Sequence, residues 1–283
     1  LKSAIEELNK LKAQQKPFFL GVGFFKPHLP FNAPKKYWDL YDRPSIPIAS
    51  DPFIPRNVHV QSIGKMGEFY NYKLSDEKPT LDQSVSNGYA RKLIHGYYAS
   101  ISYIDHLIGQ LLLELKALEL DKNTIVVLWG DHGWHLGNDR KWGKHTLFDR
   151  SLKSALIVKL PGVNHASKEI NTIVETVDIY PTLLEFCGLV KPYELDGRSL
   201  VELIETGKSN HQNRAFGFWK NGLSMKTDRY RLTKFFREEE PKIELYDHLL
   251  DPEENINIAF DRHKILDSLM PFLENETPKF YFK

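Results

Sequence analysis

A long amphipathic segment that leads into a short apolar run constrains the fold of this chain most strongly. Residues 86–120 repeat apolar side chains at the spacing of one helix face, whereas residues 125–129 (IVVLW) are continuously apolar. The helix face comprises Leu93, Tyr97, Ile101, Ile104, Ile108, Leu111 and Leu115. Two further apolar runs, at 17–24 and 155–160, have the length of strands that are buried on both faces. The pattern predicts an α/β fold with a mostly parallel sheet flanked by helices.

The sequence changes character after about residue 210. Helices are expected before that point at 3–13 and 176–188, and a last helix is expected at 261–274. Between them lie short β-rich runs at 214–219, 223–226, 229–236 and 243–247. We therefore predict an α/β domain over 1–209 and a small α+β subdomain, with an antiparallel sheet, over 210–283.

The composition excludes several classes of function. The 38 basic and 37 acidic residues nearly cancel, so no overall field attracts nucleic acid, and an anionic substrate needs a local cluster of cations. The longest apolar run falls short of the roughly 20 residues that cross a bilayer, so we expect no membrane span. The single cysteine, Cys187, allows no intrachain disulfide, and its apolar helical surroundings predict a small buried thiol rather than a nucleophile.

The segment IVVLWGDHGWHLGNDRKWGKHTLF carries the strongest chemical signal. Its apolar strand delivers Asp131 and His132 at the carboxyl end, where α/β sheets commonly bind ligands, and this pair can offer oxygen and nitrogen to one divalent metal. Lys141, Lys144 and His145 follow within a short loop. A metal beside lysine suits a tetrahedral oxyanion. Each residue alone is equally compatible with a structural role, such as a helix cap or a solvated lysine, and only the combination favours a site.

A second candidate contact follows the apolar run at 17–24. Lys26 and His28 lie in the sequence KPHLP, whose two prolines stiffen the turn and hold Lys26 out of helical geometry. A histidine in such a turn is often merely packed. In the predicted sheet, however, this loop shares one edge with Asp131, which makes it a credible anion contact.

These segments together resemble the sulfatase family of the alkaline-phosphatase superfamily, and within it the branch typified by iduronate-2-sulfatase. The resemblance rests on KPFFLGVGFFKPHLPF, YYASISYIDHLIGQLL, NTIVVLWGDHGWHLG, KWGKHTLF, VETVDIYPTLLEFCGL and ELYDHLLDPEENINIA. It covers nearly the whole chain except an aperiodic segment near 50–85. The histidine at position 132 supports this branch, because much of the wider family has asparagine there.

The resemblance implies a site residue by residue. Asp131 and His132 resemble two of the calcium ligands, and Lys144 and His28 resemble the sulfate-binding lysine and histidine. The resemblance also implies nearby residues that help to orient the substrate, namely Lys26, Trp134, His135 and His145. The catalytic set is then His28, Lys144 and His145, and the residue that protonates the leaving oxygen is either His28 or His145.

One departure from the family is serious. Sulfatases use a formylglycine made within a C/S-x-P-x-R motif, together with an earlier Asp-Asp pair for calcium, and neither occurs in these 283 residues. In the family both elements precede the equivalent of residue 1. We therefore expect the nucleophile in a missing N-terminal segment of the same protein, and we expect residues 1–283 alone to be inactive. The resemblance further implies a periplasmic, secreted or lysosomal type of location, which the sequence itself leaves open.

The resemblance implies a calcium-dependent sulfuric ester hydrolase that acts on a sulfated saccharide in glycan degradation. Hydrated formylglycine would attack sulfur while calcium, Lys144 and His28 bind the sulfate oxygens. One alternative is a phosphate or phosphonate ester hydrolase of the alkaline-phosphatase superfamily. Another is a noncatalytic fragment that binds sulfated glycans.

Overall fold

The computed structural model describes residues 1–72, 77–162, 169–208, 213–236 and 242–281. The chain divides into two compact units. The first comprises Leu1–Phe53, Lys65–Lys144 and Lys153–Asn164, and the second comprises Ile54–Gly64, His145–Leu152 and His165–Lys283. The expected boundary between residues 209 and 210 lies outside the described residues, so that division stays a prediction.

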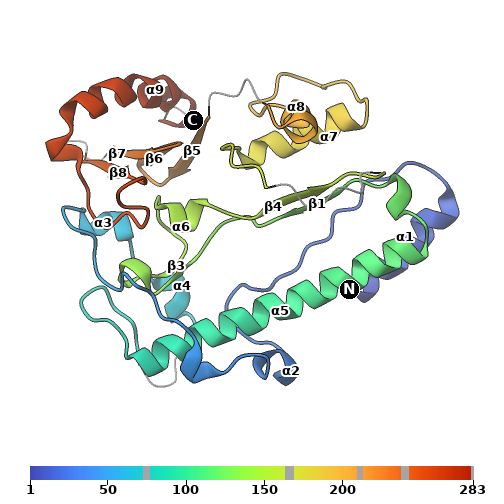
Figure 1. Ribbon diagram of the computed structural model, residues 1–283, viewed down its shortest axis with the longest axis horizontal. Coiled ribbons are helices and arrows are strands. Elements are labelled where there is room, and N and C mark those ends of the chain that lie inside the picture. Colours follow the sequence, from blue (N-terminus) through green and yellow to red (C-terminus); the bar gives the residue numbers. More distant parts are fainter. Residues whose placement is uncertain (73–76, 163–168, 209–212, 237–241, 282–283) are drawn as a thin grey trace. The chain divides into compact units, whose positions relative to one another are not determined.

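The first unit is built around one long helix (Figure 1). Its elements are α1 (Lys2–Gln14), α2 (Lys35–Trp38), η1 (Arg43–Ser45), α4 (Gly67–Tyr70), α5 (Asn87–Ala117), η2 (Asp121–Asn123), β1 (Val126–Trp129), β2 (His135–Leu136), η3 (Asn138–Arg140), β3 (Trp142–Gly143) and β4 (Leu156–Lys159). Among all residues that the structure describes, no helix combines the length and the apolarity needed to cross a membrane.

Helix α5 confirms the predicted long helix. It begins where the Ser86 hydroxyl accepts the backbone N–H of Tyr89, an N-cap that satisfies one donor of the first turn. Both α1 and α2 pack along it. A Cβ at Gly96 would lie 2.9 Å from the side chains of Phe31 and Trp38, so glycine allows these aromatic rings to approach the helix backbone closely.

The core of the first unit lies between the first half of α5 and parts of the same unit that precede and follow this helix in the sequence. The buried cluster comprises Leu29, Ile46, Met66, Phe69, Ala90, Ile94 and Trp142. The predicted helix face is therefore only partly the buried one: Leu115 is buried, but Ile101 is exposed. Elements earlier in the chain, α2 and η1, pack on α5, and the 3.6-residue pattern of the helix alone does not reveal which face they cover.

The parallel sheet expected from the sequence is not confirmed. Strands β1 and β4 form an antiparallel pair in which Val126 lies opposite Lys159. A parallel pair would need a connection that carries the chain back to the end of the sheet where β1 begins, and β4 instead runs in the opposite direction to β1. All residues at 17–25 are described, and none belongs to a strand. The pair is also not buried on both faces, since Trp129 is 52% and Ile157 is 58% exposed.

The second unit contains the antiparallel sheet that the β-rich runs predict. Its elements are α3 (Val60–Ile63), α6 (Asp149–Leu152), η4 (Thr176–Asp178), α7 (Ile179–Phe186), α8 (Val201–Thr206), β5 (Arg214–Trp219), β6 (Gly222–Thr227), β7 (Tyr230–Phe235), β8 (Lys242–Asp247), η5 (Ala259–Asp261) and α9 (His263–Tyr281). The four strands pair in the order β5-β6-β7-β8, each antiparallel to its neighbour (Figure 1). This prediction is confirmed.

Alternation along the strands separates an apolar face from a polar one. Leu223, Met225 and Leu232 belong to an apolar cluster, and helix α9 contacts the two strands that carry them. Their neighbours Ser224 and Arg231 lie on the opposite face, in accordance with the two-residue period of a strand, and are buried as well. The second unit therefore contains a buried polar layer as well as an apolar core.

The prediction of a buried thiol at Cys187 is wrong, because this cysteine is exposed. Helix α7 ends at Phe186, and Gly188 then adopts a φ of 63°, the left-handed conformation that commonly ends a helix. The chain turns toward solvent at this point, where the following Val190 is also exposed.

Candidate active site

The turn that carries Lys26 and His28 is stabilised by hydrogen bonds between a side chain and the backbone of the same turn. The Lys26 ammonium donates to the carbonyl oxygens of His28 and Pro30, the former at 3.1 Å. Burial lowers the pKa of Lys26. The Lys26 side chain thus stabilises its own turn, whereas the imidazole of His28 contacts Glu68 in α4.

A carboxylate that the sequence did not signal joins two of the predicted anion contacts. Glu68 in α4 places its Oε1 2.8 Å from His28 Nε2 and 3.1 Å from Lys144 Nζ. Burial alone would raise the pKa of this carboxyl, but Lys144 and His28 outweigh that effect and hold the pKa below its usual value. Two donors from distant parts of the sequence therefore converge on one oxyanion.

An aromatic ring lies beside this group. The Lys144 ammonium lies 5.7 Å from the centre of the Trp134 ring, within the range of a cation–π contact. The Trp134 ring also packs against Phe31 and lies 6.4 Å from the ring of His132. The structure thus brings together His28, Lys144, Trp134 and His132 in the first unit.

The pair predicted to bind metal lies just past the end of β1. The Asp131 side chain is 79% exposed, and its Oδ2 is 3.5 Å from His132 Nε2. The other ring nitrogen, Nδ1, is 2.8 Å from the carbonyl oxygen of Gly133. Metal-binding histidines commonly donate one ring N–H to such a carbonyl and bind the ion through the other nitrogen.

This arrangement fits two ligands of one cation but does not complete a site. Calcium takes six to eight ligands in most proteins, and the described residues contain no group of three or more histidine, cysteine or acidic side chains placed to hold a metal. The assignment of calcium to Asp131 and His132 stays a prediction.

Two other predicted residues are placed differently. His135 is fully buried in the first unit, where its Nδ1 lies 3.0 Å from the Asp139 carboxylate. This placement favours a supporting role in the β2–β3 loop over substrate contact. His145 belongs to the second unit, where its ring stacks on Trp219 at a centroid distance of 4.8 Å. The roles predicted for these two histidines stay predictions.

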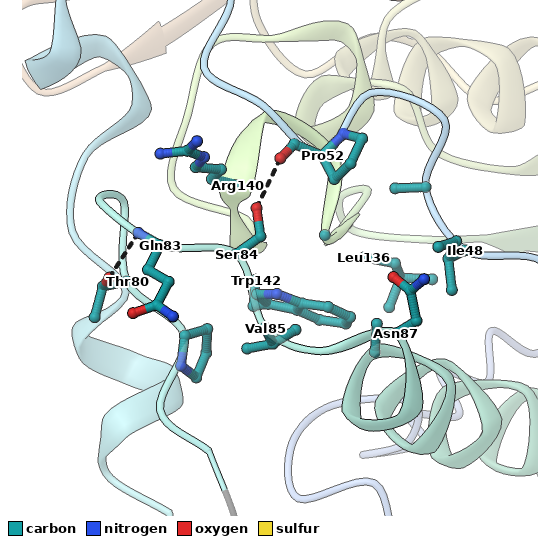
Figure 2. Close-up of a pocket in the computed structure, with 14 residues that line it drawn as sticks. Ile48, Pro52, Thr80, Gln83, Ser84, Val85, Asn87, Leu136, Arg140 and Trp142 are labelled. Atoms are coloured by element: carbon teal, nitrogen blue, oxygen red, sulfur yellow. Dashed lines mark hydrogen bonds between the residues drawn. The ribbon is translucent and has the colours of Figure 1, made fainter.

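A small cavity of about 70 Å³ lies elsewhere in the first unit (Figure 2). Trp142, Gln83 and Ser84 are among its lining residues. The Gln83 backbone N–H donates to the Thr80 hydroxyl, and the Ser84 hydroxyl donates to the Pro52 carbonyl oxygen. None of the predicted site residues lines this cavity. We therefore do not place the substrate there.

Comparisons with known proteins agree with this fold. A phosphonate monoester hydrolase from Agrobacterium radiobacter superposes with a TM-score of 0.78 at 23% identity, over 96% of this chain and 59% of that one. This likeness shows that the chain shares the fold of the matching part of that hydrolase.

The sequence comparisons define the family. The sulfatase profile matches residues 1–189, and the profile described as N-sulphoglucosamine sulphohydrolase, C-terminal, matches residues 130–277. A sulfatase from Formosa agariphila is 34% identical over 90% of this chain and 48% of its own length. Human iduronate 2-sulfatase is 31% identical over 73% of this chain and 42% of its own length. The chain belongs to the sulfatase family, and it spans about half the length of the curated relatives it matches.

Proposed function

We propose that this protein hydrolyses a sulfate monoester of a sugar. The observation that carries the proposal is the convergence of His28 Nε2 and Lys144 Nζ, at 2.8 and 3.1 Å, on one carboxylate oxygen. A carboxylate oxygen and a sulfate oxygen accept hydrogen bonds from the same kinds of donor, so the contacts with Glu68 support the proposal that His28 and Lys144 serve an oxyanion bound beside this carboxylate. Family membership and the resemblance to iduronate 2-sulfatase supply the reaction class.

The residues of this chain have distinct parts in the proposed reaction. Lys144 and His28 bind sulfate oxygens and stabilise the charge of the transition state. The Trp134 ring limits the positions open to the Lys144 ammonium. A bound calcium ion, held in part by Asp131 and His132, would supply further positive charge to the sulfate. The nucleophile, a formylglycine, is proposed to lie outside these 283 residues.

The proton for the leaving sugar oxygen needs a separate donor. His28 and His145 are both candidates, because imidazole titrates near neutral pH. His28 lies in the oxyanion cluster, whereas His145 stacks on Trp219. Replacement of each by glutamine tests the assignment: loss of the donor should slow esters with poor leaving groups far more than aryl sulfates with good ones.

The proposal is tested by sulfate release from sulfated disaccharides, with the protein in its full length. Lys144→Ala should lower turnover by about 10²–10³-fold, the usual effect of removing one donor to a transition-state oxyanion. Lys122→Ala is the matched control, because this exposed lysine of η2 pairs with the exposed Glu119. Near-wild-type release by Lys144→Ala would refute the assignment. Faster hydrolysis of a phosphate or phosphonate ester than of the sulfated disaccharide would instead support the alternative ester hydrolase.

A further inference from the structure

The carboxylate of Glu68 occupies a position that is unusual for an acidic residue. Its Oε1 accepts from the same two donors, His28 and Lys144, that are proposed to bind the substrate anion. The three side chains are all partly buried, with 24, 27 and 16% exposed for Glu68, His28 and Lys144. An acidic group beside an anion site must affect which anions can bind there.

The charges of these three side chains can be counted from their contacts. His28 Nδ1 lies 2.8 Å from the Leu29 carbonyl oxygen, and Nε2 lies 2.8 Å from Glu68. Both neighbours are acceptors, so the imidazole donates to both of them only when it carries two protons and one positive charge. With the Lys144 ammonium and the Glu68 carboxylate, the three side chains together then carry a net charge of about +1.

We propose that Glu68 is a specificity-determining residue that matches this site to esters with one negative charge and disfavours esters with two. The inference rests on the proposed function, because it takes His28 and Lys144 as the donors to the ester oxyanion. A sulfate monoester carries one negative charge at any physiological pH. A phosphate monoester carries about 1.5 to 2 negative charges near pH 7. Glu68 thus distinguishes two tetrahedral esters of similar size by charge.

The physical reason is the additional repulsion that a second charge meets. Each negative charge on the ligand interacts separately with Glu68, so a dianion is repelled about twice as strongly as a monoanion. At the separation of neighbouring groups in a partly exposed site, one such interaction corresponds to about a tenfold change in affinity. A calcium ion at Asp131 and His132 would act equally in variants that differ only at Glu68, so their comparison isolates the carboxylate.

A purely structural role for Glu68 makes a different prediction. If the carboxylate served only to hold His28 and Lys144 in place, its replacement would weaken all anions to a similar degree. A role in charge selection changes the ratio of two affinities instead. The ratio is therefore the quantity to measure.

Benzenesulfonate and phenylphosphonate form a suitable pair of probes, because they have similar shape and resist hydrolysis. At mildly alkaline pH the first carries one negative charge and the second carries two. Calorimetry on the full-length protein gives both dissociation constants for wild type, Glu68→Gln and Glu68→Asp. Glu7→Gln is the matched control, since Glu7 is an exposed residue of α1 that pairs with Lys10.

We expect Glu68→Gln to increase the affinity for phenylphosphonate about tenfold relative to benzenesulfonate, and the increase should shrink at high salt. Glu68→Asp retains the charge and should keep the wild-type ratio, as should Glu7→Gln. A Glu68→Gln ratio within twofold of wild type, including equal weakening of both probes, would overturn charge selection by Glu68. Lys144→Met separates this result from a failure of the site. If Lys144→Met leaves both affinities unchanged, the anion site itself is wrongly placed, and both proposals fall.

Discussion

Replacement of Arg231 by methionine should destabilise the second unit severely. Arg231 in β7 is buried, with 2% of its side chain exposed. Its Nε donates to Glu254 Oε1 at 2.6 Å, its Nη1 donates to Ser224 Oγ at 3.1 Å, and its Nη2 contacts the Asp149 carboxylate. One guanidinium therefore compensates two carboxylates in the polar layer of the sheet.

The size of the effect follows from what the variant leaves behind. Methionine replaces the aliphatic stem of Arg231 but none of its donors. Glu254, also 2% exposed, would retain only His248 at 2.7 Å and the Asp149 backbone N–H at 2.9 Å among its observed contacts. Removal of one partner from a buried ion pair costs about 3–5 kcal/mol, because a buried charge remains uncompensated. We expect Arg231→Met to lower the unfolding free energy of this unit by that amount.

A nearby arginine provides the control. Arg229 donates to both oxygens of Asp247, at 2.9 and 2.7 Å, but its side chain is 45% exposed. Asp247 is buried, with 7% of its side chain exposed, but after the change it keeps the backbone N–H of Leu249 at 3.1 Å as a donor. Arg229→Met should therefore destabilise the unit less than Arg231→Met, although it breaks an ion pair with two hydrogen bonds.

The assay must follow the second unit alone, because a chain with two units need not unfold in one step. Trp219 is the one tryptophan among the five of the sequence that belongs to this unit. Its ¹⁹F signal in protein labelled with 5-fluorotryptophan reports local unfolding in urea. A loss for Arg231→Met no larger than that for Arg229→Met would refute the reasoning.

The same cluster predicts how stability depends on pH. Burial alone would raise the pKa of Glu254, but the positive charges of Arg231 and His248 outweigh burial and hold this pKa below its usual value. A carboxyl with a lowered folded-state pKa contributes stability above its unfolded value of about 4.3, and this stability is lost as the pH falls through the folded value. Wild type should therefore lose stability below about pH 4.3 more steeply than Arg231→Met. Parallel pH profiles would contradict this account.

Three further predictions concern other parts of the chain. Gly197→Ala would place a Cβ 2.0 Å from the carbonyl oxygen of Val177, so the backbone must shift, and thermal unfolding should show a loss of about 1–3 kcal/mol. Lys144→Met should raise the pKa of Glu68, measured from its carboxyl ¹³C shift, because Lys144 helps to hold that pKa down; an unchanged value would exclude the contact. Ser86→Ala should cost α5 about 0.5–2 kcal/mol through the lost N-cap, and increased amide exchange in the first turn would reveal it.

The local elements were largely predictable from the sequence. The helix at 87–117 follows from a sustained 3.6-residue period, and the four strands after residue 213 follow from short β-rich runs separated by turns. Which strands pair with each other was harder to predict from the sequence. An apolar run such as 17–24 has the composition of a buried strand, but only its neighbours decide whether it pairs. The prediction of a strand at 17–24 is wrong because tertiary contacts, which the local sequence does not contain, decide whether such a run pairs.

The candidate site was predictable only where residues are close in sequence or match a motif. Asp131 and His132 are adjacent, and Lys144 lies in the same motif-bearing segment. Glu68 has neither property: it is one glutamate in an aperiodic segment, brought to His28 and Lys144 by the fold of the first unit. No local signal marks such a residue, because its significance depends on contacts with positions 40 and 76 residues away along the chain.

Lys141 shows why counting cations in a loop overstates an anion site. The residue types alone offered two cations three residues apart, Lys141 and Lys144, and only the family resemblance singled out Lys144. In the structure Lys141 is buried, and its ammonium donates to the Lys65 carbonyl oxygen at 2.9 Å. This ammonium therefore stabilises the β2–β3 region from inside the unit. Lys144 is partly exposed and contacts Glu68. The anion that such a loop accepts therefore depends on the charges that its internal contacts leave available. In this unit the Glu68 carboxylate contributes to that net charge as directly as the Lys144 ammonium does.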